Sequence, residues 1–410
     1  MNIKVKERVL QINMGQVPKG YKKTKAGIIP DEWNLKKLGS IALINKKQLS
    51  ENTVSNYKFY YIDIGCVEAG KIKYSAKPIL FKNAPSRARR KVNINDIIMS
   101  TVRPNLKAFA YIRDERNNLI CSTGFSVLSE KKEISLSKYI FYNLFSYQSE
   151  KYYFACVVGS NYPALNNSDV RKLPIPIPSL SEQQKIAEIL STCDKVIELK
   201  EKLIEQKKLQ KKYLMQVLLD PKSPYFRRLI GFKGEWQEVN LEDISEITTG
   251  KLDANAMTEN GDYKFFTCAK ESYLINKYAF DTEALLVSGN GANVGYVHYY
   301  KGKFNAYQRT YVLDKFKQNI ILIKYMLDIF LKARIHKEKN EGNTPYIRLD
   351  TLGKMKIKLP LSIEQKSIVN VLSAADQEIS LLEKELEQQK LKKKALMQLL
   401  LTGKVRVNVS

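Results

Sequence analysis

The 410-residue chain has only two histidines, His298 and His336, too few for a histidine-rich metal site or for catalysis by several histidines. Its cysteines are also few and scattered. They are Cys66, Cys121, Cys156, Cys193 and Cys268, with no C-x-x-C pair among them. This spacing excludes a zinc finger and is typical of a protein from a reducing compartment, so we expect buried, unpaired thiols.

A long apolar segment is missing as well. No run approaches the roughly 20 residues of a membrane-spanning helix. The opening MNIKVKERVLQINMG contains no continuous apolar stretch of the kind found in signal peptides. Hydrophobic residues make up 44% of the chain and charged residues 27%, as in ordinary globular proteins. We therefore expect a soluble, cytoplasmic protein of two or three domains, without membrane association.

Negative charge is scarce relative to positive charge. The chain has 68 Lys and Arg residues against 42 Asp and Glu residues, which gives a formal net charge of +26. Such an excess favours a polyanionic partner, and nucleic acid before a membrane surface. A merely basic soluble protein is the alternative that charge alone leaves open.

Four motifs that are typical of enzymes are absent from the sequence. There is no N/D-P-P-Y-type loop of an adenine methyltransferase and no G-x-x-x-x-G-K-[ST] phosphate-binding loop. The glycine run SGNGANVG (288–295) lacks the third glycine of a dinucleotide-binding turn, and PDEW (30–33) has no E-x-K partner of a nuclease. We expect a non-catalytic chain that binds no metal or cofactor of its own.

What the sequence does contain is an internal repeat. Residues 178–219 align with 360–401 at an offset of 182, without a gap and with about half of the positions identical. In each copy a Ser and Gln pair at capping-box spacing, Ser181 with Gln184 and Ser362 with Gln365, predicts a helix start. Apolar residues then recur in steps of three and four, interrupted by lysines such as Lys207, Lys211 and Lys393. Each copy predicts one helix of roughly 38 residues.

The segments before the two helices correspond more weakly. GIIPDEWNLKKLGSI (27–41) and GFKGEWQEVNLEDI (231–244) share a Trp and the Leu spacing after it, and we expect Trp33 and Trp236 to pack in cores rather than to stack on bases. Strand-like stretches follow in each half: 57–64, 96–102 and 122–128, then 263–269, 284–289 and 308–313. Each half is predicted to be a mixed α/β globule followed by one long helix.

Taken together, these residues resemble the specificity subunits of type I restriction-modification enzymes. The likeness rests on YKKTKAGIIPDEW (21–33), FRRLIGFKGEW (226–236) and two copies of P-x-x-x-E-Q-x-x-I running into K-K-x-L-M-Q-x-L-L, and it covers nearly the whole chain. Residues 1–13 lie outside the pattern.

The resemblance implies an α/β (mixed α+β) fold of two similar target-recognition domains and two long helices, packed as an antiparallel coiled coil with pseudo-two-fold symmetry. The expected segments are an N-terminal extension (1–14), recognition domain 1 (15–178), a central helix (179–220), recognition domain 2 (221–360) and a C-terminal helix (361–410). Each domain would read one half of a bipartite, asymmetric target in double-stranded DNA, and the helices would set the spacer between the halves.

The resemblance also implies partners. Two methyltransferase subunits would dock on the helices and motor-nuclease subunits would complete the complex, with S-adenosylmethionine, ATP and Mg²⁺ used by those subunits. Two other hypotheses stay open from the sequence: a stand-alone DNA-binding regulator or architectural protein without enzyme partners, and a self-sufficient nuclease or methyltransferase.

Candidate DNA-binding residues fall in loops beside the predicted strands. Basic side chains can neutralise phosphates, and Arg, Asn and Gln can read guanine and adenine edges, although solvated charge and ordinary turns are the alternative in each case. In the first half the candidates are Arg87, Arg89, Arg90, Lys91, Arg103, Asn105, Lys107, Ser160, Asn161 and Tyr162. In the second half they are Asn290, Asn293, Gln308, Arg309, Asn343, Thr344, Tyr346 and Arg348.

Overall fold

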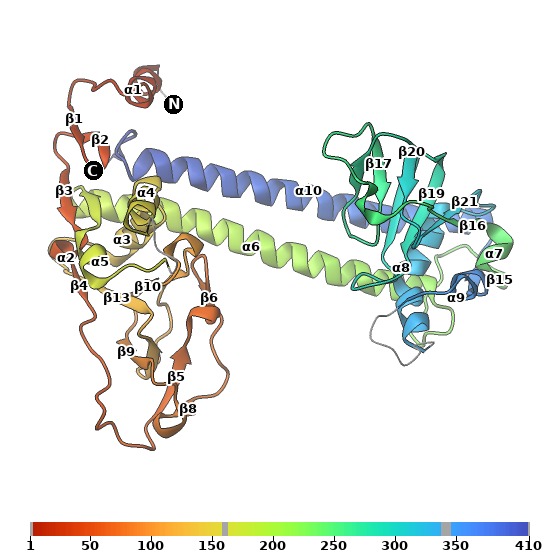
Figure 1. Ribbon diagram of the computed structural model, residues 1–410, viewed down its shortest axis with the longest axis horizontal. Helices are drawn as coiled ribbons and strands as arrows, with labels where there is room; N and C mark the ends of the chain where they lie inside the picture. The colour runs from red at the N-terminus through yellow and green to blue at the C-terminus, as the bar shows by residue number, and fades with distance from the viewer. Residues whose placement is uncertain (1–2, 158–162, 338–345, 409–410) are drawn as a thin grey trace. The chain divides into compact units, whose positions relative to one another are not determined.

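The computed structural model describes residues 3–157, 163–337 and 346–408. The chain divides into two compact units, and each contains parts of both long helices. Unit 1 comprises Met1–Lys200 and Glu385–Ser410, and unit 2 comprises Glu201–Lys384. Both marked ends of the chain belong to unit 1 (Figure 1).

Unit 1 holds two four-stranded sheets and several short helices. The sheets have the strand orders β11-β10-β13-β4 and β8-β5-β12-β9. The strands of these two sheets are β4 (Ala42–Ile44), β5 (Lys58–Ile62), β8 (Ile79–Leu80), β9 (Ala88–Val92), β10 (Ile97–Ser100), β11 (Phe109–Tyr111), β12 (Leu119–Ser122) and β13 (Phe125–Glu130). Three two-stranded ladders add β1 (Tyr21–Thr24) with β2 (Gly27–Pro30), β3 (Asn34–Lys37) with β14 (Pro174–Ile177), and β6 (Val67–Glu68) with β7 (Lys71–Ile72). The shorter helices are α1 (Ile3–Asn13), α2 (Leu38–Ile41), α3 (Ser137–Leu144), α4 (Tyr147–Val157) and α5 (Asn167–Lys172).

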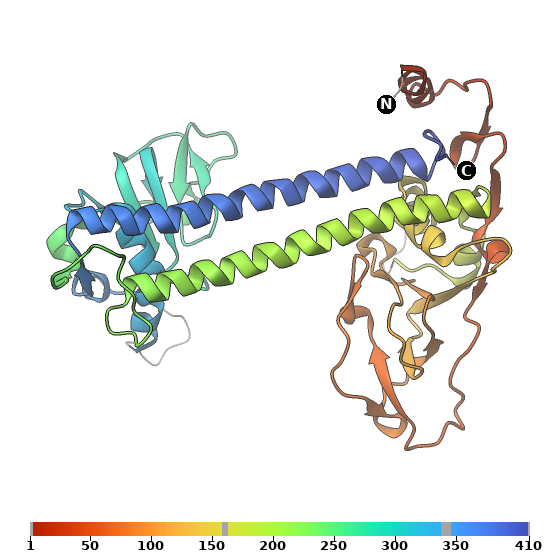
Figure 2. The ribbon, with the colours of Figure 1, turned by 180° about the vertical axis from the view of Figure 1, so that it is seen from behind.

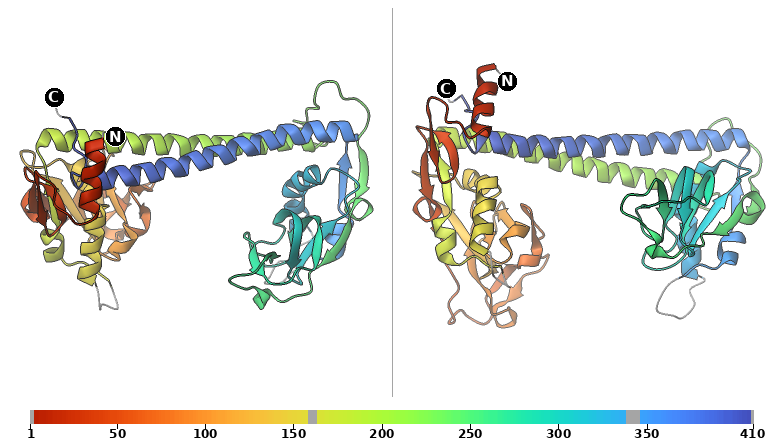
Figure 3. Two further views of the ribbon diagram at one scale, coloured as in Figure 1. Left: turned by 90° about the horizontal axis from the view of Figure 1, so that it is seen from above. Right: turned by 45° about the horizontal axis from the view of Figure 1, so that its top comes forward.

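Unit 2 is built on one six-stranded sheet with the order β16-β21-β19-β20-β17-β18. Its strands are β16 (Glu246–Thr249), β17 (Tyr263–Phe266), β18 (Tyr273–Ile275), β19 (Phe280–Ser288), β20 (Val297–Ala306) and β21 (Thr310–Asp314). A separate ladder joins β15 (Gln237–Asn240) to β22 (Lys356–Leu359). The helices are α7 (Leu241–Ile244), α8 (Ile320–Lys337) and α9 (Leu349–Gly353), and α8 lies against β19 and β20, as Figure 3 shows.

The two units share one central motif although their sequences differ. The order β11-β10-β13-β4 in unit 1 corresponds to β20-β19-β21-β16 in unit 2. The ladder after Trp33, β3 with β14, likewise corresponds to β15 with β22 after Trp236. The units differ in the additional strands, which form a second sheet in unit 1 and extend the single sheet in unit 2. The mixed α/β repeat predicted from the sequence is confirmed.

The long helices are α6 (Leu180–Leu219) and α10 (Ser362–Leu400), of 40 and 39 residues, close to the predicted length. Within each unit their segments run side by side in opposite directions (Figures 1 and 2). In unit 1, Asp194 pairs with Lys393 and Lys200 pairs with Glu385. In unit 2, Lys207 pairs with Glu378 and Lys211 with Asp376. Residue numbers rise along α6 as they fall along α10, so the predicted antiparallel packing is confirmed in both units.

Each hydrophobic core includes the end of a helix that begins in the other unit. The unit 1 core contains Leu400 and Leu401, from the end of α10, beside Ile186 and Leu190 of α6. The unit 2 core contains Leu218 and Leu219, from the end of α6, beside Ile368 and Leu372 of α10. Because the leucines at the two helix ends are repeated, each helix end makes equivalent apolar contacts in the core that it enters.

Some local predictions need correction. The capping boxes are wrong: the Gln184 amide donates to Glu188, and the Gln365 amide donates to the carbonyl of Pro360. The cysteines are unpaired as expected, but only Cys121 is fully buried. Trp33 is buried and Trp236 is half-buried against the unit 2 core, which confirms core packing over base stacking.

Candidate nucleic-acid interface

In unit 1, four loops meet beyond the end of β10. The Thr101 amide donates to the carbonyl of Gly124, and the Leu165 amide donates to the carbonyl of Thr101, both at 2.8 Å. The Arg103 amide donates to the carbonyl of Pro163, also at 2.8 Å. A further bond from the Thr123 amide to the carbonyl of residue 87 attaches the segment before β9. We call residues 85–87, 101–107, 122–124 and 163–165 the first loop cluster.

The first loop cluster presents exposed polar and basic side chains. Arg87, Arg103 and Asn105 are exposed. Lys107 is half-buried and forms an ion pair with Glu150 of α4 at 3.0 Å. The predicted residues of the 101–107 loop therefore lie beside Arg87, and this cluster offers positive charge together with an amide.

The remaining basic residues of the segment 86–91 lie on strand β9 and have different surroundings. Lys91 is exposed, and the guanidinium of Arg89 lies 5.0 Å from the centre of the Phe81 ring. Arg90 donates to Oδ1 of Asn45 at 2.9 Å and to the carbonyl of Phe125. Burial lowers the pKa of the Arg90 guanidinium below its ordinary value. Successive side chains of a strand point to opposite faces, so the run does not form one basic patch.

Unit 2 builds a corresponding arrangement beyond the end of β19. The Gly289 amide donates to the carbonyl of Arg309 at 2.8 Å, and the Ile347 amide donates to the carbonyl of Gly289 at 2.7 Å. An isolated β-bridge joins Asn290 to Tyr346. We call residues 267–269, 289–295, 308–309 and 346–348 the second loop cluster.

Several predicted residues of the second loop cluster hold the loops together. Oδ1 of Asn290 accepts from the Cys268 thiol at 3.0 Å, and Nδ2 of Asn293 donates to the Cys268 carbonyl at 3.0 Å. The outer residues are Gln308, Arg309, Tyr346 and Arg348, which are exposed. The Arg348 guanidinium donates to the Tyr346 hydroxyl at 3.2 Å, and this bond raises the pKa of Arg348.

The two loop clusters are equivalent by their backbone hydrogen bonds. Thr101 takes the place of Gly289, Gly124 that of Arg309, and Leu165 that of Ile347. The bridge between residues 102 and 164 likewise matches the bridge between residues 290 and 346. One backbone frame therefore carries two different sets of side chains.

Sequence reasoning missed a triad that attaches each globule to the helices. In unit 1 the Tyr142 hydroxyl donates to Oδ2 of Asp194 at 2.7 Å, and Lys393 pairs with the same carboxylate. In unit 2 the Tyr325 hydroxyl donates to Oδ2 of Asp376 at 2.7 Å, and Lys211 pairs with it at 2.5 Å. Burial and the adjacent carboxylate raise the pKa of both tyrosines. The offset of 182 relates the two Asp and the two Lys, which was a signal in the sequence.

A second repeated feature lies at the start of each long helix. Buried Glu182 accepts from Nε of Arg406 at 2.6 Å and from the indole of Trp33 at 3.1 Å. Buried Glu364 accepts from Nε of Arg228 at 2.8 Å. In both units the arginine lies in the segment that follows the other long helix. The segment after α10 therefore binds the start of α6, and the segment after α6 binds the start of α10.

Comparison with known proteins identifies the family of this chain. The family model described as type I restriction modification DNA specificity domain matches residues 30–208 and 233–391. The chain belongs to this family. It is a DNA specificity subunit of a type I restriction-modification system, and the alternative of a stand-alone regulator is not supported. Specificity subunits are non-catalytic parts of these enzymes, which also sets aside a self-sufficient nuclease or methyltransferase.

Individual relatives are also type I specificity subunits. The EcoDI specificity subunit of Escherichia coli is 41% identical over 38% of this chain, a match that covers 34% of that protein. The putative MjaX specificity subunit of Methanocaldococcus jannaschii is 26% identical over 94% of this chain and 97% of its own length. A chain from a structure of a type I R-M system has the same fold, with a TM-score of 0.62 at 22% identity, covering 92% of this chain and 99% of that one.

Five predicted residues of this specificity subunit lie outside the described residues: Ser160, Asn161, Tyr162, Asn343 and Thr344. Within the described ranges, no group of three or more His, Cys, Asp or Glu could hold a metal ion. No helix in the same ranges combines the length and hydrophobicity needed to cross a membrane.

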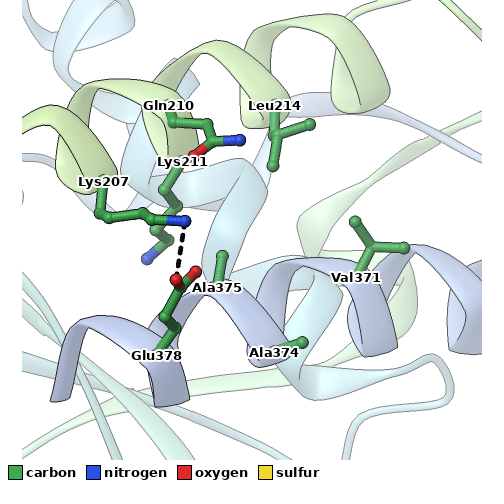
Figure 4. A pocket seen from close by; sticks show the side chains of 8 residues that line it. All are labelled: Lys207, Gln210, Lys211, Leu214, Val371, Ala374, Ala375 and Glu378. Atoms are coloured by element: carbon green, nitrogen blue, oxygen red, sulfur yellow. Dashed lines mark ion pairs between the residues drawn. The ribbon is translucent and has the colours of Figure 1, made fainter. Parts of the chain in front are cut away.

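The helix pair of the specificity subunit has a small groove in unit 2. Its volume is about 220 Å³, and Figure 4 shows the ion pair between Lys207 and Glu378 across it. The small side chains Ala374 and Ala375 form one wall. The lysines that interrupt the apolar stripe in the sequence therefore lie at the helix seam and form ion pairs across it.

Proposed function

We propose that the two loop clusters read the two halves of a bipartite, asymmetric DNA target. The observation that carries this proposal is the equivalence of their backbone frames combined with their different side chains. The net charge of +26 supports a double-stranded DNA partner, because neutralised phosphates contribute sequence-independent affinity. In this proposal the recognition domains span 15–178 and 221–360, and the helices 179–220 and 361–410 set the spacer. The complex acts on cytoplasmic DNA.

The helices also dock two methyltransferase subunits in this proposal. Leu199 and Leu391 in unit 1, and Leu381 and Leu209 in unit 2, have exposed fractions between 56% and 61%. The offset of 182 relates Leu199 to Leu381 and Leu209 to Leu391. Exposed apolar residues on a helix surface favour a protein partner, and two equivalent sites favour two copies of one partner.

The catalytic steps then belong to the partners. Methyltransferase subunits use S-adenosylmethionine, and motor-nuclease subunits use ATP and Mg²⁺. This chain contributes the positioning of both on a chosen sequence.

Methylation mapping tests the DNA proposal. The chain is purified with its methyltransferase partners and incubated with S-adenosylmethionine and a DNA library, and the methylated adenines are mapped by sequencing. We expect two short half-sites separated by a gap of fixed length and unspecified sequence. A single uninterrupted motif would contradict the proposal.

Charge introduced on one docking surface tests the partner proposal. Leu199→Glu combined with Leu391→Glu places carboxylates on the unit 1 surface, so we expect native mass spectrometry to detect one bound methyltransferase instead of two. Ile230→Glu is the control, because Ile230 is fully exposed outside the helices. Two bound copies in the double variant would show that the subunits dock elsewhere.

A further inference from the structure

The loop after β10 and the loop after β19 both contain left-handed residues at two equivalent positions. Arg103 and Lys107 are left-handed, with φ of 47° and 52°. In the second loop cluster Gly291 and Gly295 are left-handed, each with φ of 78°. Since the bonds that flank the two loops are equivalent, 103–107 and 291–295 occupy the same place in the two units.

Glycine is the ordinary residue for such positions. A side chain in the left-handed region brings its Cβ close to a carbonyl oxygen and costs stability, whereas glycine adopts this conformation freely. Unit 2 shows that this loop forms with glycine at both positions. Arg103 and Lys107 therefore lower the stability of unit 1 by a cost that unit 2, with glycine at both positions, does not have. Backbone strain of this kind is often linked to function.

The two strained residues differ in what their side chains contact. Lys107 pairs with Glu150, which anchors the end of the loop on α4. Arg103 is exposed, and among the described residues no ion pair engages its guanidinium. Its amide donates to the carbonyl of Pro163 at 2.8 Å, and the next residue, Pro104, is buried. A backbone held by these bonds thus presents an exposed guanidinium from the middle of the first loop cluster.

We propose that Arg103 reads a guanine in the half-site bound by unit 1, and that its left-handed backbone is retained because it presents the guanidinium to the major groove. Arginine binds O6 and N7 of guanine in a bidentate manner, the commonest base-specific contact in protein–DNA complexes. Unit 2, with glycine at the equivalent place, reads its half-site through other side chains. This inference rests on the proposed DNA function and assigns a base to one residue.

Three variants of the full chain, in complex with its methyltransferase partners, separate charge from strain: Arg103→Gly, Arg103→Ala and Arg103→Lys. Affinity is measured for the mapped target and for targets with each G·C pair replaced in turn, and thermal unfolding is followed for each variant. We expect Arg103→Gly and Arg103→Ala to bind the target roughly 10- to 100-fold more weakly and to lose discrimination at one G·C pair of one half-site.

The stability readout distinguishes this role from a structural one. Arg103→Gly relieves the strain and Arg103→Ala retains it, so the Gly variant should unfold at a temperature no lower than the parent and above the Ala variant. Arg103→Lys retains a positive charge without the bidentate donor pair, and we expect it to bind while losing discrimination. Arg113→Ala, an exposed arginine outside the cluster, should leave the discrimination intact.

Three results would overturn the inference. Arg103→Gly could retain discrimination at every G·C pair, it could lose affinity equally for all targets as expected for a phosphate contact, or it could unfold below Arg103→Ala. If the parent complex itself preferred no half-site, the proposed function would fail and this inference with it.

Discussion

At the scale of single residues, His298 links the second loop cluster to pH. Its Nε2 donates to the carbonyl of Ala269 at 2.9 Å, so it fixes the loop that contains Cys268. Burial, together with the charge of Lys324, lowers the pKa of His298 below its ordinary 6.5, against the opposing effect of the bond to Ala269. The folded unit therefore favours the neutral imidazole.

The sign of the effect follows from linkage. Below about pH 6.5 the unfolded chain binds a proton at His298 that the folded chain does not, so the free energy of unfolding falls as the pH falls. We expect the melting temperature of unit 2 to drop between pH 7.5 and 5.5, and His298→Gln to reduce that drop while keeping a donor for Ala269. His336→Gln is the control, because His336 is exposed. Equal drops in all three proteins would contradict this reading.

Individual site residues were only partly predictable from the sequence. The loops around Arg103 and Asn290 were located correctly because they follow strands with clear apolar patterns. The inward bonds of Arg90 depend on which face of β9 is covered, which is set by pairing with β12 some 30 residues later in the chain. The contact between Cys268 and Asn290 requires two loops from different strands to meet, so no local pattern indicates it.

At the scale of elements, the helix seam combines apolar contacts with ion pairs. Lys211 and Asp376 are 20% and 44% exposed, so we expect a modest coupling energy of about 0.5–1 kcal/mol between them. The test is a double-mutant cycle with Lys211→Met and Asp376→Asn, followed by chemical unfolding. Asp376→Asn retains an acceptor for Tyr325, which limits other losses.

A surface pair provides the comparison. Lys301 and Glu283 lie 3.3 Å apart, and their exposed fractions are 72% and 36%. Their coupling should be close to zero because water screens both charges. If the pair of Lys211 and Asp376 showed no greater coupling than this one, the seam would depend on apolar contacts alone.

The internal repeat made the helices and strands predictable, but the different sequences of the two globules limited the prediction of their sheets. Helix length followed from an apolar stripe written twice, the antiparallel direction was an implication of the family resemblance, and the strands followed from β-branched and aromatic runs. The sequence of one helix alone presents the lysines as interruptions of the stripe, because it does not show that the other helix supplies Asp and Glu at matching positions. Whether extra strands form a second sheet, as in unit 1, or extend the first, as in unit 2, depends on tertiary packing that short strands do not encode.

At the scale of the whole molecule, each loop cluster is built within one unit, so the half-sites should be exchangeable. Replacing residues 15–178 with the corresponding domain of another family member should change one half-site and leave the other, together with the gap length, unchanged. Methylation mapping of the chimaera measures this. A change in both half-sites would show that the readers are coupled.

Such a replacement has one physical requirement. Glu182 is buried between Arg406 and Trp33, and an incoming domain must supply an equivalent indole donor, or the carboxylate loses one of its partners. A matched pair of chimaeras, with and without the tryptophan, should therefore differ in stability but not in half-site sequence.

The discontinuity of unit 1 has a consequence for synthesis on the ribosome. Its final segment, Glu385–Ser410, emerges only after the whole of unit 2, on the order of 10–40 s later at ordinary translation rates. Until then the nascent first globule lacks Leu400, Leu401 and the guanidinium that neutralises Glu182. Unit 2 is contiguous in the chain, so we expect its core to be completed before that of unit 1, although unit 1 is the first to begin translation.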